Sequence, residues 1–254
     1  MKLYVFSAKK FILNIIAVSF VAVLIILNYN NTQNVFRQNK SDELPIYCVE
    51  TNEKQCAISF DAAWGAEDTD ILIEILDKYN VKATFFVVGQ WVDKYPNEVK
   101  KLSDAGHDVM NHSDTHPYMT KLDNNSMINE VENCTRKIEK ITNKKVNLFR
   151  APYGDYNAKV INKLNSLKYY TIQWDVDSLD WKDLSADEIY KRVVTKTKNG
   201  SIILFHNAAK NTPEALPKIL EKLKKDGFEI VKINDLIYKD KYIIDNAGKQ
   251  IKTE

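Results

Sequence analysis

The stretch Asn111–Pro117 reads Asn-His-Ser-Asp-Thr-His-Pro and carries two of the four histidines in this chain of 254 residues, His112 and His116. A separation of four residues brings two imidazoles to one face of a helical turn, where both can reach one metal ion. Pro117 disfavours the helical region for the residue before it, so we expect any turn to end there and the pair to lie on a loop. Such pairs also arise by chance, so the rest of the chain has to show whether this pair binds a metal.

The composition indicates one large domain and excludes an obvious nucleic-acid binder. The chain has 36 basic and 34 acidic residues, a formal net charge of +2. This near-neutral balance, without any recognition motif for nucleic acid, gives no reason to expect such a partner. Beyond the N-terminal segment, roughly 205 residues remain, which is enough for a single domain with a well-buried core.

The three cysteines do not have the spacing of a zinc site. Cys48 and Cys56 flank a predicted hairpin turn, so a disulfide across two strands is one interpretation, and Cys134 would then be unpaired. The other interpretation is that all three are small buried hydrophobic residues, because free cysteine is commonly buried. The sequence favours the second interpretation and assigns the cysteines no chemistry.

A nearly unbroken apolar run at Phe11–Leu27 predicts a membrane segment. Its 17 residues lie at the lower limit for crossing a bilayer core of about 30 Å. Lys2, Lys9 and Lys10 precede the run, and no positive charge follows it until Arg37. The positive-inside bias therefore places the N-terminus in the cytoplasm and the remainder of the chain outside.

We expect this segment to be an uncleaved signal anchor. A cleaved signal peptide would have a shorter apolar core and a small-x-small cleavage site, which the asparagine-rich sequence after Leu27 does not offer. The predicted organisation is a cytoplasmic N-terminus at 1–10, a transmembrane anchor at 11–27 and a polar linker at 28–45. An extracytoplasmic domain at 46–238 and a polar tail at 239–254 come next, at the cell membrane.

Residues 46–238 alternate about seven times between short apolar runs and amphipathic stretches. This alternation predicts either a parallel α/β barrel or a doubly wound sheet. We expect strands at 46–50, 55–61, 83–88, 107–110, 147–149, 169–174, 201–205 and 228–231. We expect helices at 68–79, 96–105, 124–142, 157–167, 185–198 and 212–225, with N-caps within Asn124–Ser126 and at Ser185.

Polar side chains gather where the predicted strands end. Asp61, His112, Arg150, the run Asp175–Asp180 and His206 each follow a strand. In parallel barrels the carboxyl ends of the strands form one rim, and active sites are built there. One such coincidence would carry little weight, but five together indicate a catalytic or binding rim.

Some polar residues near this rim are expected to have structural roles. His107 follows a helix-ending glycine and is predicted to pack in the core. Asp114 lies two residues from His112 and should point away from a metal bound there. Asp175 and Asp177 are expected to position their loop.

Five segments, in this order, resemble the motifs of the polysaccharide deacetylase family, also called carbohydrate esterase family four or the NodB homology domain. They are Ser59-Phe-Asp-Ala-Ala-Trp-Gly65, His112-Ser-Asp-Thr-His116, Arg150-Ala-Pro-Tyr-Gly154, Asp177-Ser-Leu-Asp-Trp181 and Leu204-Phe-His206. The resemblance spans about residues 47–238. It implies a distorted (β/α) barrel and a hydrolase that removes acetyl groups from N-acetylated sugars, acting on carbon–nitrogen bonds other than peptide bonds, with a divalent metal.

The resemblance also implies how the metal and the base are held. His112 and His116 match the family's metal ligands, and zinc is the expected ion. A bound metal lowers the pKa of its water and polarises the carbonyl. Asp61 matches the general base, and Arg150 would keep it charged and oriented.

The resemblance also implies which residues act on the leaving amine and which enclose the acetyl group. His206 matches the general acid, with Asp180 as its orienting partner. The backbone N–H of Tyr153 matches an oxyanion donor. Trp181 and Leu204 match the walls of the acetyl pocket.

Ala62 departs from the family's pattern. The usual third metal ligand is the second aspartate of the first motif, and alanine has no ligand atom. Catalytic zinc sites usually have three protein ligands. One outcome is an enzyme with altered metal use, in which water or Asp61 completes the shell. The other is a domain that binds glycan without efficient turnover.

The stretch Phe60–Gly65 resembles the sporulation-associated, PdaB-type branch of the family, where this loss is usual and a single N-terminal anchor is present. It implies a membrane-anchored deacetylase of peptidoglycan amino sugars that acts in spore-wall maturation. We also expect the protein to be a monomer. A hydrolase of another acetylated polysaccharide, such as an acetyl-xylan esterase, is the remaining alternative.

Overall fold

The computed structural model describes residues 44–253. The predicted cytoplasmic N-terminus, the membrane anchor and nearly all of the linker lie outside these residues. Within 44–253, no helix is both long and apolar enough to cross a membrane.

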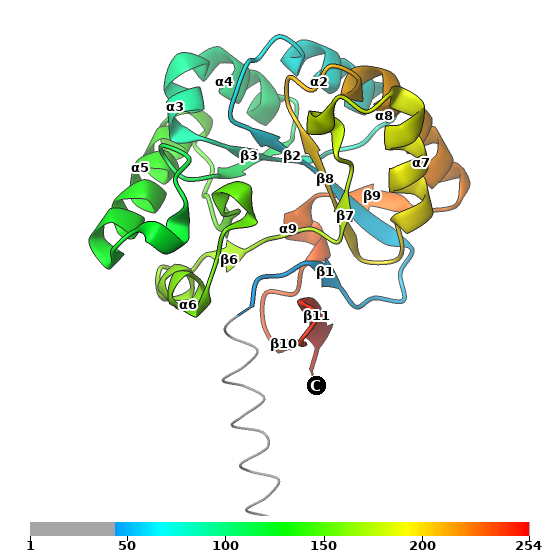
Figure 1. The fold of residues 1–254 in the computed structure, drawn as a ribbon. Coiled ribbons are helices and arrows are strands. Elements are labelled where there is room, and N and C mark those ends of the chain that lie inside the picture. Colours follow the sequence, from blue (N-terminus) through cyan, green and yellow to red (C-terminus); the bar gives the residue numbers. More distant parts are fainter. Residues whose placement is uncertain (1–43, 254) are drawn as a thin grey trace, which may run out of the picture. The chain divides into compact units, whose positions relative to one another are not determined.

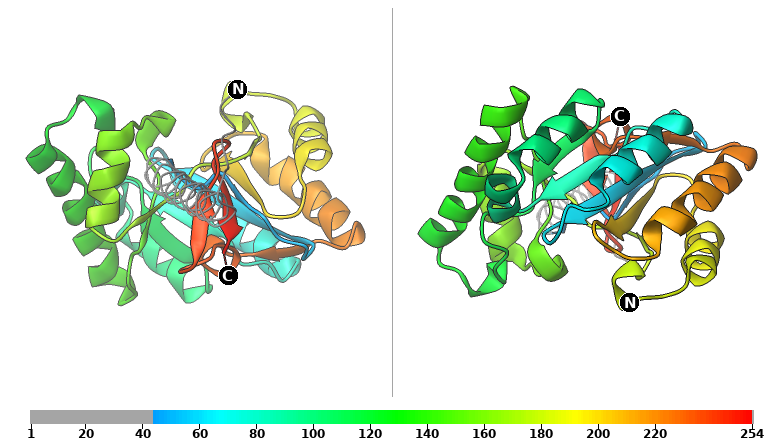
Figure 2. Two further views of the ribbon diagram at one scale, coloured as in Figure 1. Left: turned by 90° about the horizontal axis from the view of Figure 1, so that it is seen from below. Right: turned by 90° about the horizontal axis from the view of Figure 1, so that it is seen from above.

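The strand β2 (Gln55–Ala62) lies at the centre of the sheet. It pairs in parallel with β3 (Thr84–Val87), β8 (Ser201–His206) and β9 (Glu229–Val231). Seven of its eight residues are buried, as expected for a parallel strand covered on both faces. The helices lie around the outside of the sheet in all three ribbon views (Figures 1 and 2).

The parallel sheet curls, and a single β-bridge joins the segment just before its first strand to the segment just after its last parallel strand. Beyond β3 come β4 (Asp108–Asn111), β5 (Leu148–Phe149) and β6 (Tyr170–Thr171), while β8 also pairs with β1 (Cys48–Val49) and β7 (Val176–Asp177). The bridge links Ile46 to Ile172, and Gln173 N–H donates to the Ile46 carbonyl over 2.7 Å. The fold is therefore an α/β fold with a curled, distorted barrel.

Six α-helices begin and end close to the predicted positions. They are α2 (Thr69–Lys78), α4 (Pro96–Asp104), α5 (Asn124–Thr142), α6 (Ala158–Ser166), α7 (Ala186–Lys196) and α8 (Thr212–Lys225). The short helices α3 (Gly89–Lys94) and α9 (Ile233–Leu236) were not predicted. Ser185 caps α7 in a reciprocal capping box with Glu188. The expected cap of α5 was wrong by one residue, because Asp123 accepts the Ser126 N–H.

Stacked aromatic rings hold the three central strands in register. Phe60 stacks on Phe85 at 4.8 Å and on Phe205 at 5.6 Å between ring centroids, and all three are buried. The next residues along β2 and β8, Asp61 and His206, are partners in the ladder. The packing therefore brings these two polar side chains to the same edge of the sheet.

The described part of the predicted polar tail (residues 239–253 of 239–254) contains instead a hairpin that extends the sheet. Its strands β10 (Tyr242–Ile244) and β11 (Lys249–Lys252) pair antiparallel, and β11 pairs in parallel with β1. Gln250 is fully buried, and its side-chain amide bonds both the N–H and the carbonyl of Tyr238. The polar composition that suggested a tail is normal for strands at the edge of a sheet.

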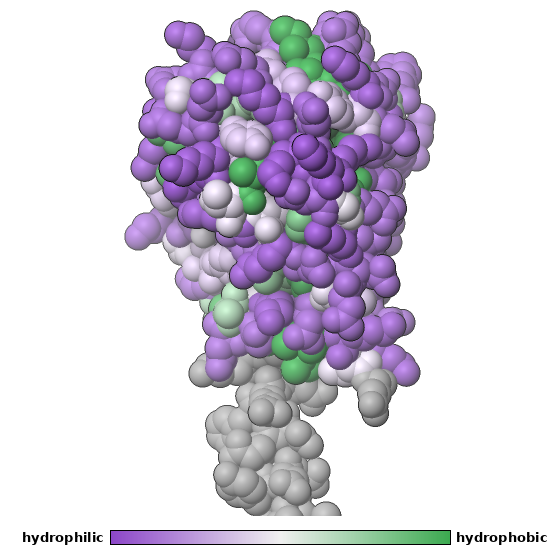
Figure 3. Space-filling model, turned by 90° about the vertical axis from the view of Figure 1, so that its right-hand side faces the viewer, coloured by the Kyte–Doolittle hydropathy of each residue, from purple (hydrophilic) through white to green (hydrophobic). Residues whose placement is uncertain are grey.

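The three cysteines are free, so the disulfide interpretation was wrong. Cys56 and Cys134 are buried, and Cys48 is half-buried. Burial raises the pKa of the Cys48 thiol to about 11 and that of Cys56 to about 12, which keeps both protonated. The face seen in Figure 3 is largely hydrophilic, with hydrophobic residues in separate patches.

Candidate active site

His112 directly follows β4 and is fixed in one orientation. It is 2% exposed, and its Nδ1 lies 2.8 Å from the carbonyl of Arg150. Because a carbonyl only accepts, Nδ1 carries the proton and Nε2 keeps its lone pair. That Nε2 lies 3.5 Å from Asp61 Oδ2.

His116 reaches the same place from a loop, as expected, and the helical turn considered for the pair does not form. Ser113 and His116 have φ of +70° and +62°, and Ser113 Oγ accepts the His116 N–H. The two imidazole centroids lie 5.0 Å apart. Burial and the neighbouring His112 lower the pKa of His116 to about 4, and its buried Nδ1 has no hydrogen-bond partner among the residues that the structure describes. Asp114 points away, toward Lys137 at 2.6 Å.

Asp61 is held by the fully buried guanidinium of Arg150. Arg150 Nη1 lies 2.7 Å from Asp61 Oδ1, while Nη2 donates to Ser59 Oγ and to the Gln173 carbonyl. Burial alone would raise the pKa of Asp61, but the charge of Arg150, helped by His112, brings it below the ordinary value. The carboxylate is therefore ionised and oriented, with Oδ2 facing His112.

His206 forms a second pair with Asp180. His206 Nδ1 lies 2.8 Å from Asp180 Oδ1, and Asp180 Oδ2 accepts the His206 backbone N–H and the Thr212 hydroxyl. Burial would lower the pKa of His206, but the hydrogen bond and charge of Asp180 raise it above the ordinary value. The imidazole is thus suited to hold a proton and release it into the pocket.

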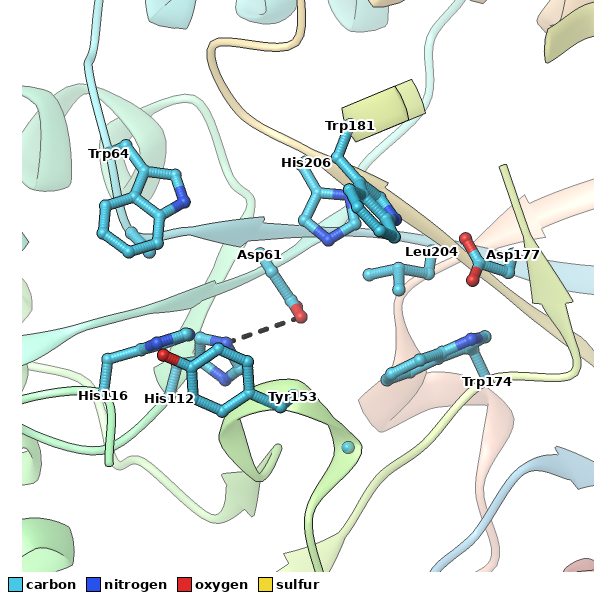
Figure 4. A pocket seen from close by; sticks show the side chains of 12 residues that line it. Asp61, Trp64, His112, His116, Tyr153, Trp174, Asp177, Trp181, Leu204 and His206 are labelled. Carbon is cyan, nitrogen blue, oxygen red and sulfur yellow. Dashed lines mark ion pairs between the residues drawn. The ribbon is translucent and has the colours of Figure 1, made fainter. Parts of the chain in front are cut away.

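Both pairs face one cavity of about 460 Å³ (Figure 4). Asp61 and His206 line it directly, whereas Arg150 and Asp180 support them from behind and do not line it. The other lining residues are Ala63, Trp64, His112, His116, Tyr153, Gly154, Trp174, Asp177, Trp181 and Leu204. The structure therefore gathers all of the site residues expected from the sequence at this cavity.

Four lining side chains, those of Ala63, Trp64, Trp174 and Asp177, had no predicted contact with the cavity. Trp64 comes after the expected strand 55–61 and Trp174 is the last residue of the expected strand 169–174, but nothing in their spacing indicates that they face the cavity. Asp177 was expected only to position its loop. It does accept the Leu179 N–H through Oδ1, and it also faces the cavity. Tyr153 takes a left-handed conformation, with φ of +60°, and its ring lies 4.6 Å from His116.

The cavity offers two histidine ligands for a metal, one fewer than the three protein ligands of the usual catalytic zinc site. His112 Nε2 and His116 Nδ1 are suitable nitrogen ligands. Ala62 is 1% exposed within the hydrophobic core and contributes no donor. Among residues 44–253 no group of three histidine, cysteine or carboxylate side chains is arranged to hold a metal. The residues present therefore do not fit a three-ligand metal site.

Comparison with known proteins identifies the family of this fold and site. The polysaccharide deacetylase family matches residues 49–172. The chain is 32% identical to the peptidoglycan-N-acetylmuramic acid deacetylase PdaA of Bacillus subtilis strain 168, over 76% of this chain and 74% of PdaA. From the same organism, the uncharacterized protein YlxY is 31% identical, and the chain spans 60% of YlxY's length.

Comparison with solved structures points to the same family. BA3943 of Bacillus anthracis, described as a CE4 family pseudoenzyme, has a TM-score of 0.74 and 36% identity, covering 77% of this chain and 69% of that one. A BA3943 mutant with restored enzymatic activity is equally similar, at a TM-score of 0.74 and 37% identity, covering 77% of this chain and 71% of that one. With the same fold as BA3943 and 32% identity to PdaA over most of both chains, this chain belongs to the polysaccharide deacetylase family.

Proposed function

We propose that this protein removes N-acetyl groups from the amino sugars of peptidoglycan. The observation that carries the proposal is that Asp61 with Arg150, and His206 with Asp180, face one cavity from neighbouring strand ends. The similarity to the peptidoglycan deacetylase PdaA supports the choice of substrate.

Amide hydrolysis needs a base, an acid and a stabilised oxyanion, and this chain supplies candidates for each. Asp61, kept ionised by Arg150, takes a proton from a water in the cavity as the water oxygen attacks the acetyl carbon. His206 gives its proton to the sugar nitrogen as the carbon–nitrogen bond breaks. The products are acetate and a free amino sugar.

Three further residues would position the substrate. The backbone N–H of Tyr153 is proposed to donate to the oxyanion, since Tyr153 lies at the cavity beside His116. Trp181 and Leu204 would enclose the acetyl methyl group from the other side (Figure 4). Both placements fit a small apolar substituent held between the acid and the base.

Several finer predictions are part of this proposal. They are anchoring in the cell membrane with the domain outside, a monomeric state, use of zinc and a role in spore-wall maturation. They rest on the sequence pattern and on the resemblance to the PdaB-type branch. Activity without a third protein ligand would then depend on the two histidines with water or Asp61.

A second candidate function is glycan binding without efficient turnover. It is favoured by Ala62 and by the lack of a three-ligand group within residues 44–253. The structural similarity to the pseudoenzyme BA3943 points in the same direction. In this case the cavity and its aromatic walls are retained for recognition alone.

Acetate release from purified peptidoglycan by the full chain separates the two candidates. It should be measured with added zinc, with a chelator and for Asp61→Asn, and peptidoglycan pull-down should accompany every arm. The matched control is Asp187→Asn, because Asp187 is 85% exposed on α7 and pairs with the exposed Lys218. Release that Asp61→Asn abolishes and Asp187→Asn preserves supports the enzyme. Binding without release under any condition supports the second candidate.

A further inference from the structure

A row of aromatic rings extends from the cavity toward the surrounding surface. The ring centroids of Trp64 and His116 are 5.5 Å apart, those of His116 and Tyr153 are 4.6 Å apart, and those of Tyr153 and Tyr118 are 4.3 Å apart. We call these four residues the aromatic strip. Tyr118 does not line the cavity, so the strip continues beyond it.

The strip is unusually exposed for such large rings. Trp64 is 65% exposed, Tyr153 57% and Tyr118 53%. Of the other large hydrophobic residues exposed within residues 44–253, Trp181 lies at the same cavity and Ile71 lies on α2. Exposed aromatic surface that gathers in one place is typical of a binding site rather than of an ordinary protein surface.

The loop that carries Trp64 is fixed before any ligand arrives. The side-chain amide of Asn207 donates to the carbonyls of Trp64 and Gly65, and the Trp91 indole N–H also donates to the Gly65 carbonyl. A ring on a fixed loop loses little conformational entropy when a ligand stacks on it. The strip is therefore preorganised at the Trp64 end.

The charges around the cavity restrict what the strip can bind. In the described part of the chain no lysine or arginine lines the cavity, and Arg150 is fully buried against Asp61. Asp61 and Asp177 contribute carboxylates, and Lys182 Nζ lies 4.9 Å from the centroid of the Trp181 ring. Trp181 itself lies across the cavity from His116 and Tyr153 (Figure 4). A ligand that carries a carboxylate at the cavity would meet these acidic groups with no lining lysine or arginine to pair with it, and the imidazole of His206 is already paired with Asp180.

We propose that the aromatic strip is a subsite for an uncharged run of N-acetylglucosamine-type sugars, with Trp64 beside the reacting sugar and Tyr118 under a sugar further along the chain. The C–H face of a pyranose ring is apolar and weakly positive, so it stacks on the negative face of an aromatic ring. N-acetylmuramic acid with a free lactyl carboxylate is disfavoured in this subsite. The class of glycan rests on the proposed function, whereas the strip itself can be tested by binding alone.

The test is calorimetric titration of the full chain with N-acetylglucosamine oligomers of two and of four sugars. A peptide-free peptidoglycan tetrasaccharide with free lactyl carboxylates provides the charged comparison. Trp64→Ala should weaken binding of both neutral oligomers about five- to tenfold. Tyr118→Ala should weaken the four-sugar oligomer by a similar factor and leave the two-sugar oligomer unchanged. Trp64→Phe should recover most of the loss, because it restores a stacking ring.

Ile71→Ala is the matched control, since Ile71 is an exposed hydrophobic residue on α2 and should leave all affinities unchanged. Equal or tighter binding of the charged tetrasaccharide would overturn the proposal. So would the absence of neutral-oligomer binding, or equal effects of Tyr118→Ala on both oligomer lengths. Loss of acetate release with these affinities intact would contradict the proposed function and leave the subsite standing.

Discussion

Replacing Arg150 by methionine should destabilise the domain strongly. The guanidinium is fully buried and lies 2.7 Å from the carboxylate of Asp61, which is itself 7% exposed. Methionine fills much of the same volume but leaves that carboxylate buried without its cation. Ser59 loses the hydrogen bond from Arg150, but its hydroxyl still donates to the Ile203 carbonyl at 2.8 Å, so this loss costs less.

The expected magnitude comes from this burial. Removing one partner of a buried ion pair costs about 3–5 kcal/mol, because the other charge is left uncompensated. For a domain of this size, 1 kcal/mol lowers Tm by about 2–4 °C, so the variant should melt roughly 6–20 °C lower. Urea unfolding and thermal melting followed by circular dichroism, both at pH 7, measure the loss.

A double-mutant cycle separates the lost pair from lost packing. Adding Asp61→Asn to Arg150→Met removes the buried charge, so the double variant should be no less stable than Arg150→Met alone. The control is Arg136→Met, because Arg136 is exposed on α5 and its loss should cost no more than about 0.5 kcal/mol. A cost below about 1 kcal/mol for Arg150→Met, or strictly additive effects in the cycle, would show that the buried pair does not hold the domain in this way.

Three further substitutions test other parts of the same geometry. Burial lowers the pKa of His107 to about 4, below its unfolded value near 6.5, so the folded state resists protonation and stability falls as the pH drops from about 6.5 to 4. His107→Asn keeps an acceptor for the Ala83 N–H and should flatten that part of the stability–pH curve in urea titrations, whereas an unchanged slope would contradict the assignment. Ala62→Asp should tighten zinc binding at least about tenfold in calorimetric titration, because it adds a third ligand beside His112, and equal affinity would show that the new carboxylate does not reach the metal. Finally, His206→Ala should slow acetate release about a hundred- to ten-thousandfold, the usual contribution of a general acid, and a loss below about tenfold would remove His206 from that role.

Features that depend on where strands end could be predicted from the sequence. Parallel strands with apolar faces end at one rim, so Asp61 and Arg150 could be expected at the same rim although they lie far apart in the chain. Their pairing was implied by the family resemblance, and the structure contains that pair. His107 could be expected in the core because it follows a helix-ending glycine, and it is fully buried against Phe85. These outcomes depend on periodicity and topology, which the sequence expresses directly.

The remaining features depend on contacts that periodicity does not express. The helix α3 has only six residues, too few for a helical stripe to be recognised. The hairpin of β10 and β11 has the charged composition of an edge, so it resembled a tail. The aromatic strip depends on left-handed conformations at His116 and Tyr153, neither of which is a glycine. Nothing in the local sequence predicts them.

In the proposed reaction, a water activated by Asp61 attacks the acetyl carbon. This step can be observed in a single turnover of peptidoglycan in water enriched in heavy oxygen, with mass spectrometry of the acetate. We expect one heavy oxygen in the acetate released by the unaltered protein and no acetate from Asp61→Asn. Acetate without the label would mean that a protein oxygen attacks instead, and no acetate at all, with peptidoglycan still bound, would contradict catalysis by this site.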